Sequence, residues 1–141
     1  MAEVEIPAGF VPQYAVAFGA VDAPAVAVHE DNPLPVRAVQ KPAGSIPLTG
    51  TLTASGIAGP FAPDLDRPIW VTLTGEWTGT VEVLRSTDGG VTSLPLTAGG
   101  ARWARFTANC NEAVVSESEA GALHYVSATL LNGTLTYRVA Q

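Results

Sequence analysis

From residue 46 onward, apolar and polar residues alternate in short runs that are separated by glycine and asparagine. Alternation with a period of two residues is typical of antiparallel strands, because successive side chains point to opposite faces of the sheet. No helical period of 3.6 residues lies between the runs. Strands are predicted near residues 47–55, 69–75, 79–86, 91–97, 102–108, 112–117, 123–131 and 134–139. Eight short strands at this spacing predict an all-β domain, either a compact antiparallel sandwich or a small barrel.

The pair Asn132-Gly133 lies between two alternating runs, which favours a two-residue type I′ turn that joins them as a hairpin. Pairing Leu131 with Thr134 fixes the register of this hairpin. One face then carries the pairs Leu130 with Leu135, Ala128 with Tyr137, and Val126 with Val139. This face is predicted to lie in the core. The other face, with Ser127, Thr129, Thr136 and Arg138, is predicted to meet solvent or a wet interface.

A second tight turn is predicted at Asp88-Gly89-Gly90, where the glycines supply positive φ angles. The stretch from Ser86 to Ser93 is similar to the Asp-box pattern S-x-D-x-G-x-T-W, except that Ser93 stands in place of the tryptophan. In that pattern the aspartate side chain accepts hydrogen bonds from backbone N–H groups of the loop. Asp88 is therefore predicted to hold the turn and to take no part in a reaction.

The first 47 residues follow a different pattern, because they contain seven of the eleven prolines. Each proline removes a backbone donor and fixes φ, so no helix is expected there. Two β-prone pieces, 13–18 and 25–28, are predicted to pair as a small hairpin. Residues 29–45 are predicted to be extended, with polyproline character. The chain is thus divided into an extended N-terminal arm, residues 1–46, and an antiparallel β-sandwich domain, residues 47–141.

The arm is too apolar for a solvated disordered tail, which would be rich in charge and poor in aromatic and β-branched residues. It is therefore predicted to bind a partner surface, and the alternative is that it folds back over its own domain. The residues predicted to contact the partner are Phe10, Tyr14, Phe18, Pro33, Leu34, Pro35 and Val36.

Composition and charge narrow the classes of partner. Charged residues make up 14% of the chain, against a usual share of about 25%, as expected when much of the surface is covered. The net charge is −6 and Lys41 is the single lysine, so no basic stripe is available to bind nucleic acid. Apolar runs stay well below the roughly 20 residues of a membrane span, and Glu3 and Glu5 argue against a secretory signal. We expect a soluble protein that folds in the cytoplasm.

Residues that commonly bind metals are poorly spaced for that purpose. Asp64 and Asp66 supply only the first two ligands of a calcium loop, so a solvated loop is favoured. His29 and His124 lack the spacing of zinc ligands. Cys110 has no partner for an internal disulfide and is predicted to be a small, half-buried core residue. No metal ion or cofactor is predicted.

Carboxylates for acid/base catalysis are present in one segment, at Glu112, Glu117 and Glu119, but they would need a cleft to act as a pair. The chain contains no nucleophile elbow, no phosphate-binding loop and no dinucleotide-binding glycine motif. No catalytic residue is predicted, although a small glycosidase or esterase is kept as one of the alternative functions.

Trp70, Trp77 and Trp103 could form a flat platform for stacking sugar rings. Trp70 alternates with apolar neighbours in a predicted strand, and a sandwich needs large core fillers. Burial in the core or in a subunit interface is therefore favoured. A carbohydrate-binding module, with its site at the tryptophans and the loops around Asp64 and Asp88, is kept as an alternative.

The arm contains His29-Glu-Asp-Asn-Pro-Leu-Pro-Val36, which follows the predicted small hairpin. The segments 77–90, 103–108, 119–122 and 135–138 follow in the domain. In this order, and loosely over most of the chain, the segments resemble those of small virion structural proteins of tailed bacteriophages.

The resemblance implies a non-enzymatic capsid decoration (cement) protein that is anchored to the major capsid protein through its N-terminal arm. A fibre or adaptor protein of the head, neck or tail is the alternative. The resemblance also implies a location in the virion, other virion proteins as partners, and a homo-oligomer, with a trimer favoured. Binding of a host glycan is not favoured. Extended arms can add strands across neighbouring subunits, which fits the composition of residues 1–46.

Overall fold

The computed structural model describes residues 17–19, 22, 26–31, 33–37 and 41–141. The chain forms two units, residues 1–41 and residues 42–141, and the division lies a few residues before the predicted boundary. In the described residues the regular elements are strands. The first unit contains β1 (Ala17–Phe18) and β2 (Val26–Ala27). The second contains β3 (Leu48–Leu52), β4 (Gly56–Phe61), β5 (Pro68–Ser86), β6 (Leu94–Pro95), β7 (Thr97–Ala98), β8 (Ala101–Arg102), β9 (Arg105–Phe106), β10 (Cys110–Ser116) and β11 (Leu123–Ala140).

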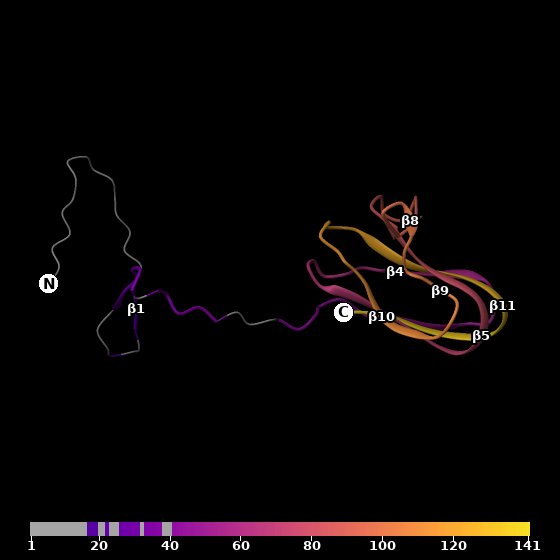
Figure 1. Ribbon diagram of the computed structural model, residues 1–141, viewed down its shortest axis with the longest axis horizontal. Helices are drawn as coiled ribbons and strands as arrows, with labels where there is room; N and C mark the ends of the chain where they lie inside the picture. The colour runs from indigo at the N-terminus through magenta and orange to yellow at the C-terminus, as the bar shows by residue number, and fades with distance from the viewer. Residues whose placement is uncertain (1–16, 20–21, 23–25, 32, 38–40) are drawn as a thin grey trace. The chain divides into compact units, whose positions relative to one another are not determined.

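Two long strands, β5 and β11, form the centre of the second unit. They pair antiparallel from Leu123 with Ser86 to Ala140 with Trp70, so they run side by side over almost their whole length. Figure 1 shows the two strands turning back together at one end of the unit. Each strand therefore consists of two halves that lie on either side of a bend.

The bend is made by glycines. Gly75, Gly79 and Gly133 have φ angles of 107°, 141° and 92°, a region of backbone conformation that side chains disfavour. Each also lies very close to the partner strand, because an added Cβ would overlap the carbonyl oxygen of Thr134, Thr129 or Glu76, respectively. Glycines in the interior of a strand commonly mark such bends and close approaches of two backbones.

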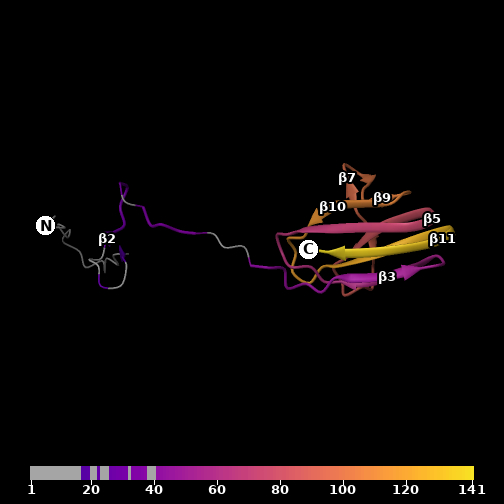
Figure 2. The same cartoon turned by 90° about the horizontal axis from the view of Figure 1, so that it is seen from below.

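The bend divides the sheet into two layers. The first layer has the order β10, first half of β5, second half of β11, β3, which Figure 2 shows side by side. In the second layer, the second half of β5 pairs with β6 and β9 on one side and with the first half of β11 on the other. The first half of β11 also pairs with β4. All these pairings are antiparallel. The architecture is an all-β sandwich, which confirms the predicted fold class.

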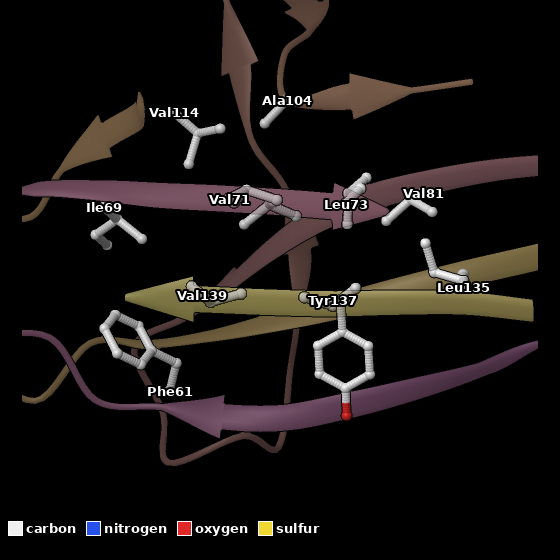
Figure 3. Close-up of a cluster of buried hydrophobic side chains, with 13 residues drawn as sticks. Phe61, Ile69, Val71, Leu73, Val81, Ala104, Val114, Leu135, Tyr137 and Val139 are labelled. Carbon is white, nitrogen blue, oxygen red and sulfur yellow. The ribbon is translucent and has the colours of Figure 1, made fainter. Parts of the chain in front are cut away.

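The core lies between the two layers, and Figure 3 shows its apolar side chains. Buried side chains come from both halves of β5 and β11, at Ile69, Val71, Leu73, Val81, Val83, Val126, Ala128, Leu135, Tyr137 and Val139. The predicted core face of β11 is thus confirmed, except that Leu130 is only half-buried. On the opposite face Thr129, Thr136 and Arg138 are exposed and Ser127 is half-buried, also as predicted.

The predicted hairpin at Asn132-Gly133 is wrong. β11 continues through both residues, which pair with Thr78 and Trp77 of β5, and the register shifts between Leu130 and Asn132. This register shift is a bulge, with an extra residue in β11. A bulge and a two-residue turn give the same sequence pattern, because each moves the buried positions from even to odd residue numbers. For a related reason the strands predicted at 69–75 and 79–86 are two halves of β5, since its glycines bend the strand without reversing it.

Other predicted strands differ in detail. The strands predicted near 91–97 and 102–108 are reduced to the two-residue pieces β6 to β9. β4 was not predicted at all, because Gly56, Gly59 and Pro60 are residues that normally weaken strands.

The small hairpin predicted in the arm is present in the first unit. β1 and β2 pair antiparallel, Ala17 with Ala27 and Phe18 with Val26. Residues 13–16 of the first predicted piece lie outside the described residues. Residues 33–37 have no regular secondary structure and are exposed.

Candidate functional site

The residues predicted to bind a partner belong to the first unit. Phe10 and Tyr14 lie outside the described residues, and Phe18 lies in β1 opposite Val26. The remaining four residues, Pro33, Leu34, Pro35 and Val36, are all exposed. Their role in binding stays a prediction.

Exposed apolar side chains gather in the described part of this unit. The exposed fractions are 40% for Val26, 36% for Val28, 41% for Leu34 and 82% for Val36. A hairpin of two short strands is at best marginally stable in water. The described part of the unit therefore combines one short strand pair with exposed apolar side chains that are available to another surface.

The turn predicted at Asp88-Gly89-Gly90 is confirmed. Asp88 Oδ1 accepts hydrogen bonds from the Thr92 N–H at 2.9 Å and from the Ser86 hydroxyl at 2.8 Å, and Ser86 Oγ accepts one from the Gly90 N–H at 2.9 Å. The Thr92 N–H and the Ser86 hydroxyl hold the pKa of Asp88 at about 2, below its ordinary value of 3.8. The side chain thus serves the turn, as the sequence indicated.

A shallow groove of about 360 Å³ lies beside this turn, lined by Arg85, Ser86, Asp88, Leu94, Thr97 and their neighbours. Ser86 and Asp88 already use their oxygens within the turn. Arg85 is engaged by two glutamates, as described next. The groove consequently offers a ligand few uncommitted side-chain groups.

A cluster of polar side chains around the buried Glu117 and His124 lies at the end of the sandwich away from the bend. Glu117, with a 3% exposed side chain, accepts hydrogen bonds from Arg85 Nε at 2.7 Å and Nη2 at 2.9 Å. It also accepts the backbone N–H groups of Ser118 and Glu119 at 3.0 and 2.9 Å. Arg85 Nη2 additionally donates to Glu119 at 2.7 Å. His124 Nε2 lies 3.0 Å from the second oxygen of Glu117. The cluster joins the end of β5, the loop after β10 and the start of β11.

Protonation states follow from these contacts. The Arg85 guanidinium holds the pKa of Glu117 at about 2, below its ordinary value of 4.5, and Glu117 in turn raises the pKa of Arg85. Burial lowers the pKa of His124 despite the neighbouring carboxylate, so the imidazole is neutral at pH 7. Because Glu117 is a pure acceptor, the proton of His124 lies on Nε2. Nδ1 is then a buried acceptor for which the described residues provide no partner.

The cluster of Arg85, Glu117, Glu119 and His124, which we call the brace, holds three segments of the sandwich together. His124 is completely buried, so its imidazole cannot touch a substrate, and Glu117 is saturated by five donors. The sequence singled out Glu117, Glu119 and His124 individually but did not bring them together or include Arg85. No local signal could have done so, since Arg85 and Glu117 are 32 residues apart and belong to different elements.

The brace makes the protein sensitive to acid. Glu117 has a lowered pKa in the fold, so its contribution is complete above pH 4.5 and is lost as the pH falls towards 2. His124 also has a lowered pKa in the fold, so the unfolded chain binds its proton first, and stability decreases as the pH falls below 6.5. Asp88 acts in the same direction as Glu117, between pH 3.8 and 2.

We expect the free energy of unfolding, measured with urea, to fall from pH 7 to pH 3, with about 2 kcal/mol of this fall arising from Glu117. The Glu117→Gln variant should show a shallower fall below pH 4.5, because the titrating group has been removed. Equal slopes for the variant and the wild type would contradict this prediction.

The tryptophans are less buried than the sequence indicated. Trp70 is 42% and Trp103 49% exposed, while Trp77 is half-buried and packs against the core. Trp77 Nε1 donates to Asn109 Oδ1 at 2.7 Å, and Trp103 Nε1 donates to the Val114 carbonyl at 2.7 Å. Core burial is therefore wrong for Trp70 and Trp103. Whether they lie in a subunit interface stays a prediction.

The remaining candidates have structural contacts. Asp64 accepts the Gly44 N–H, and its own N–H donates to Gln141 Oε1 at 2.7 Å, so it ties the start of the unit to its end. Cys110 is half-buried as predicted, and burial raises the pKa of its thiol. In the described part of the chain, no group of three or more His, Cys, Asp and Glu side chains could hold a metal ion.

Comparisons with models of protein families, with curated proteins and with solved structures give no match to this chain. No helix among the described residues is long and apolar enough to cross a membrane. Function is therefore inferred from the chain's own residues and their geometry.

Proposed function

We propose that this protein is a non-enzymatic structural component of a larger protein assembly, with residues 1–41 as the anchor and the sandwich as the body. One observation carries the proposal: the described part of the first unit exposes apolar side chains at Val26, Val28, Leu34 and Val36, beside one pair of two-residue strands. Segments with exposed apolar side chains commonly bind a partner surface, and extended ones can add strands to it.

The sandwich supports the same proposal. Its buried polar cluster and its Asp88 turn use their polar groups to hold the fold, which suits a stable body better than an active site. The resemblance to virion proteins of tailed bacteriophages supplies the class of assembly. In that assembly the chain would be a capsid decoration protein bound to the major capsid protein, and a fibre or adaptor of the neck or tail is the alternative.

Deleting residues 1–41 tests the anchor. We expect the remaining sandwich to stay folded, because its core lies wholly within residues 42–141, and to lose binding to particles that lack this protein. Co-sedimentation with such particles measures the bound copies. A truncated protein that still occupied the particles fully would refute the anchor.

Point variants in the full chain give a matched comparison. Leu34→Ala with Val36→Ala removes one leucine and one valine from the arm, and Leu94→Ala with Val91→Ala removes the same pair from exposed positions of the sandwich. The arm pair should reduce particle binding by about tenfold or more, as losses at contact side chains usually do. The sandwich pair should leave it unchanged.

A second candidate function is binding of a glycan, which the exposure of Trp70 and Trp103 favours. The two side chains lie near the same part of β10, because Trp70 pairs with Ala113 and Trp103 donates to the Val114 carbonyl. A glycan array that retained a ligand for wild type and lost it for Trp103→Ala would establish this candidate.

A further inference from the structure

One edge of the sandwich is open for pairing. β3 forms the end of the first layer, and among the described residues its strand pairing is with β11 alone (Figure 2). The N–H and C=O groups on its other edge can therefore bond to a further strand. Edge strands usually carry a lysine, a proline, a bulge or a covering side chain that prevents such pairing. Leu48-Thr49-Gly50-Thr51-Leu52 carries no charge, no proline and no bulge.

The other long edges of the sandwich are protected. β10 has a register shift between Ala113 and Val115, and Trp103 Nε1 covers its Val114 carbonyl. β4 contains Pro60, which has no N–H to offer a new strand. β6 and β9 are only two residues long. Among these edge strands of the described residues, β3 is the one of more than two residues that has no charge, no proline and no bulge.

The sequence of β3 is a palindrome. In an antiparallel pair of two β3 strands related by a twofold axis at Gly50, Leu48 faces Leu52 of the other copy and Thr49 faces its Thr51. Each strand therefore meets identical residues, with leucines on the half-buried face and threonines on the exposed face. Thr–Thr pairs and apolar pairs across strands are stabilising, and no like charges meet.

Tyr137 lies opposite Gly50, the residue at which this twofold axis would pass. Its ring reaches from β11 across β3, as Figure 3 shows, and occupies the space into which a Cβ on Gly50 would project. Tyr137 is 8% exposed and pairs with Gly50 in the register of the two strands. A twofold axis at Gly50 would bring the hydroxyl groups of both copies close to each other, where each can donate to or accept from the other.

We propose that β3 is a self-association edge, at which two copies of this chain pair antiparallel about Gly50 and continue the first layer across a twofold axis. The interface is isologous, so both copies use the same surface. A five-residue strand pair is smaller than a standard interface, so the dimer is reversible and depends on concentration. The proposal does not involve residues 1–41 and holds independently of the anchor.

The proposed register can be tested with two double charge variants of the full chain. In Thr49→Glu with Thr51→Lys, each new glutamate faces a lysine of the other copy, whereas in Thr49→Glu with Thr51→Glu it faces a glutamate. The two double variants differ only in the sign of the charge at residue 51. Both positions are exposed, and Thr49 pairs with Arg138 within the chain, so the fold should tolerate either variant. Thr74→Glu, exposed on the same outer face but within β5, is the control.

Sedimentation velocity over a range of concentrations gives the dissociation constant of each protein, and unfolding curves check that all variants fold. We expect wild type, the Glu/Lys variant and Thr74→Glu to form dimers with similar constants. The Glu/Glu variant should associate about tenfold or more weakly, because two pairs of like charges meet at the axis. A wild type that stays monomeric to about 1 mM overturns the proposal. So does association that is equally strong in the Glu/Glu and Glu/Lys variants, which would place it on another surface.

Discussion

Replacing Gly133 with alanine is expected to destabilise the sandwich by more than about 4 kcal/mol, or to prevent folding. Gly133 has φ +92°, and an alanine Cβ there would overlap the Glu76 carbonyl oxygen and approach Trp77 Cα to 2.8 Å. Both obstacles are backbone atoms of β5, which cannot move without breaking the pairing of the two central strands. Because β5 and β11 contribute to both layers, strain at the bend affects the whole core.

Gly121→Ala is the matched control for the backbone angle. Gly121 has φ +84°, close to that of Gly133, but an added Cβ meets no atom within 4 Å. Its cost should be about 1–2 kcal/mol, the ordinary penalty for a side chain in the left-handed region. Urea unfolding of both variants measures the difference. Equal losses would show that the close approach of β5 and β11 at Gly133 is not important for stability.

The same glycine shows where prediction from the sequence stops. Alternation along the chain predicted the buried set of β11, because burial follows the period of the strand whatever the strand pairs with. It could not distinguish a turn at Asn132-Gly133 from a bulge within a continuous strand, since both reverse the parity of the buried positions. Whether the chain turns or continues as one strand at Asn132-Gly133 depends on Gly75 and Gly79, which lie more than 50 residues earlier in the partner strand.

The candidate sites also differ in how far the sequence could predict them. The Asp88 turn was predictable because Ser86, Gly90 and Thr92, which complete it, lie within four residues of Asp88. The brace around Glu117 was not, because its members come from three elements that meet only in the folded sandwich. For Phe10 and Tyr14 the binding role stays a prediction, since both lie outside the described residues.

Replacing Glu117 with alanine is expected to lower the free energy of unfolding by about 3–5 kcal/mol. The substitution leaves His124 Nε2 buried without its acceptor, and it frees the N–H groups of Ser118 and Glu119. Arg85 keeps its bond to Glu119 and is 30% exposed, so most of the loss comes from the buried partners. Urea unfolding at pH 7, where Glu117 is ionised and His124 neutral, measures the effect.

Two further variants separate the role of the buried charge from that of the surface pair. Glu117→Gln keeps an oxygen acceptor for the backbone donors and should cost about 2 kcal/mol, less than alanine. Glu119→Gln removes the other partner of Arg85, but this side chain is 56% exposed, so its loss should stay below about 1 kcal/mol. If Glu119→Gln destabilised the protein as much as Glu117→Ala, the brace would depend on the charge of Arg85 and not on the buried bonds to Glu117. The predicted order, alanine at 117, then glutamine at 117, then glutamine at 119, follows from the burial of each acceptor and the number of donors it satisfies.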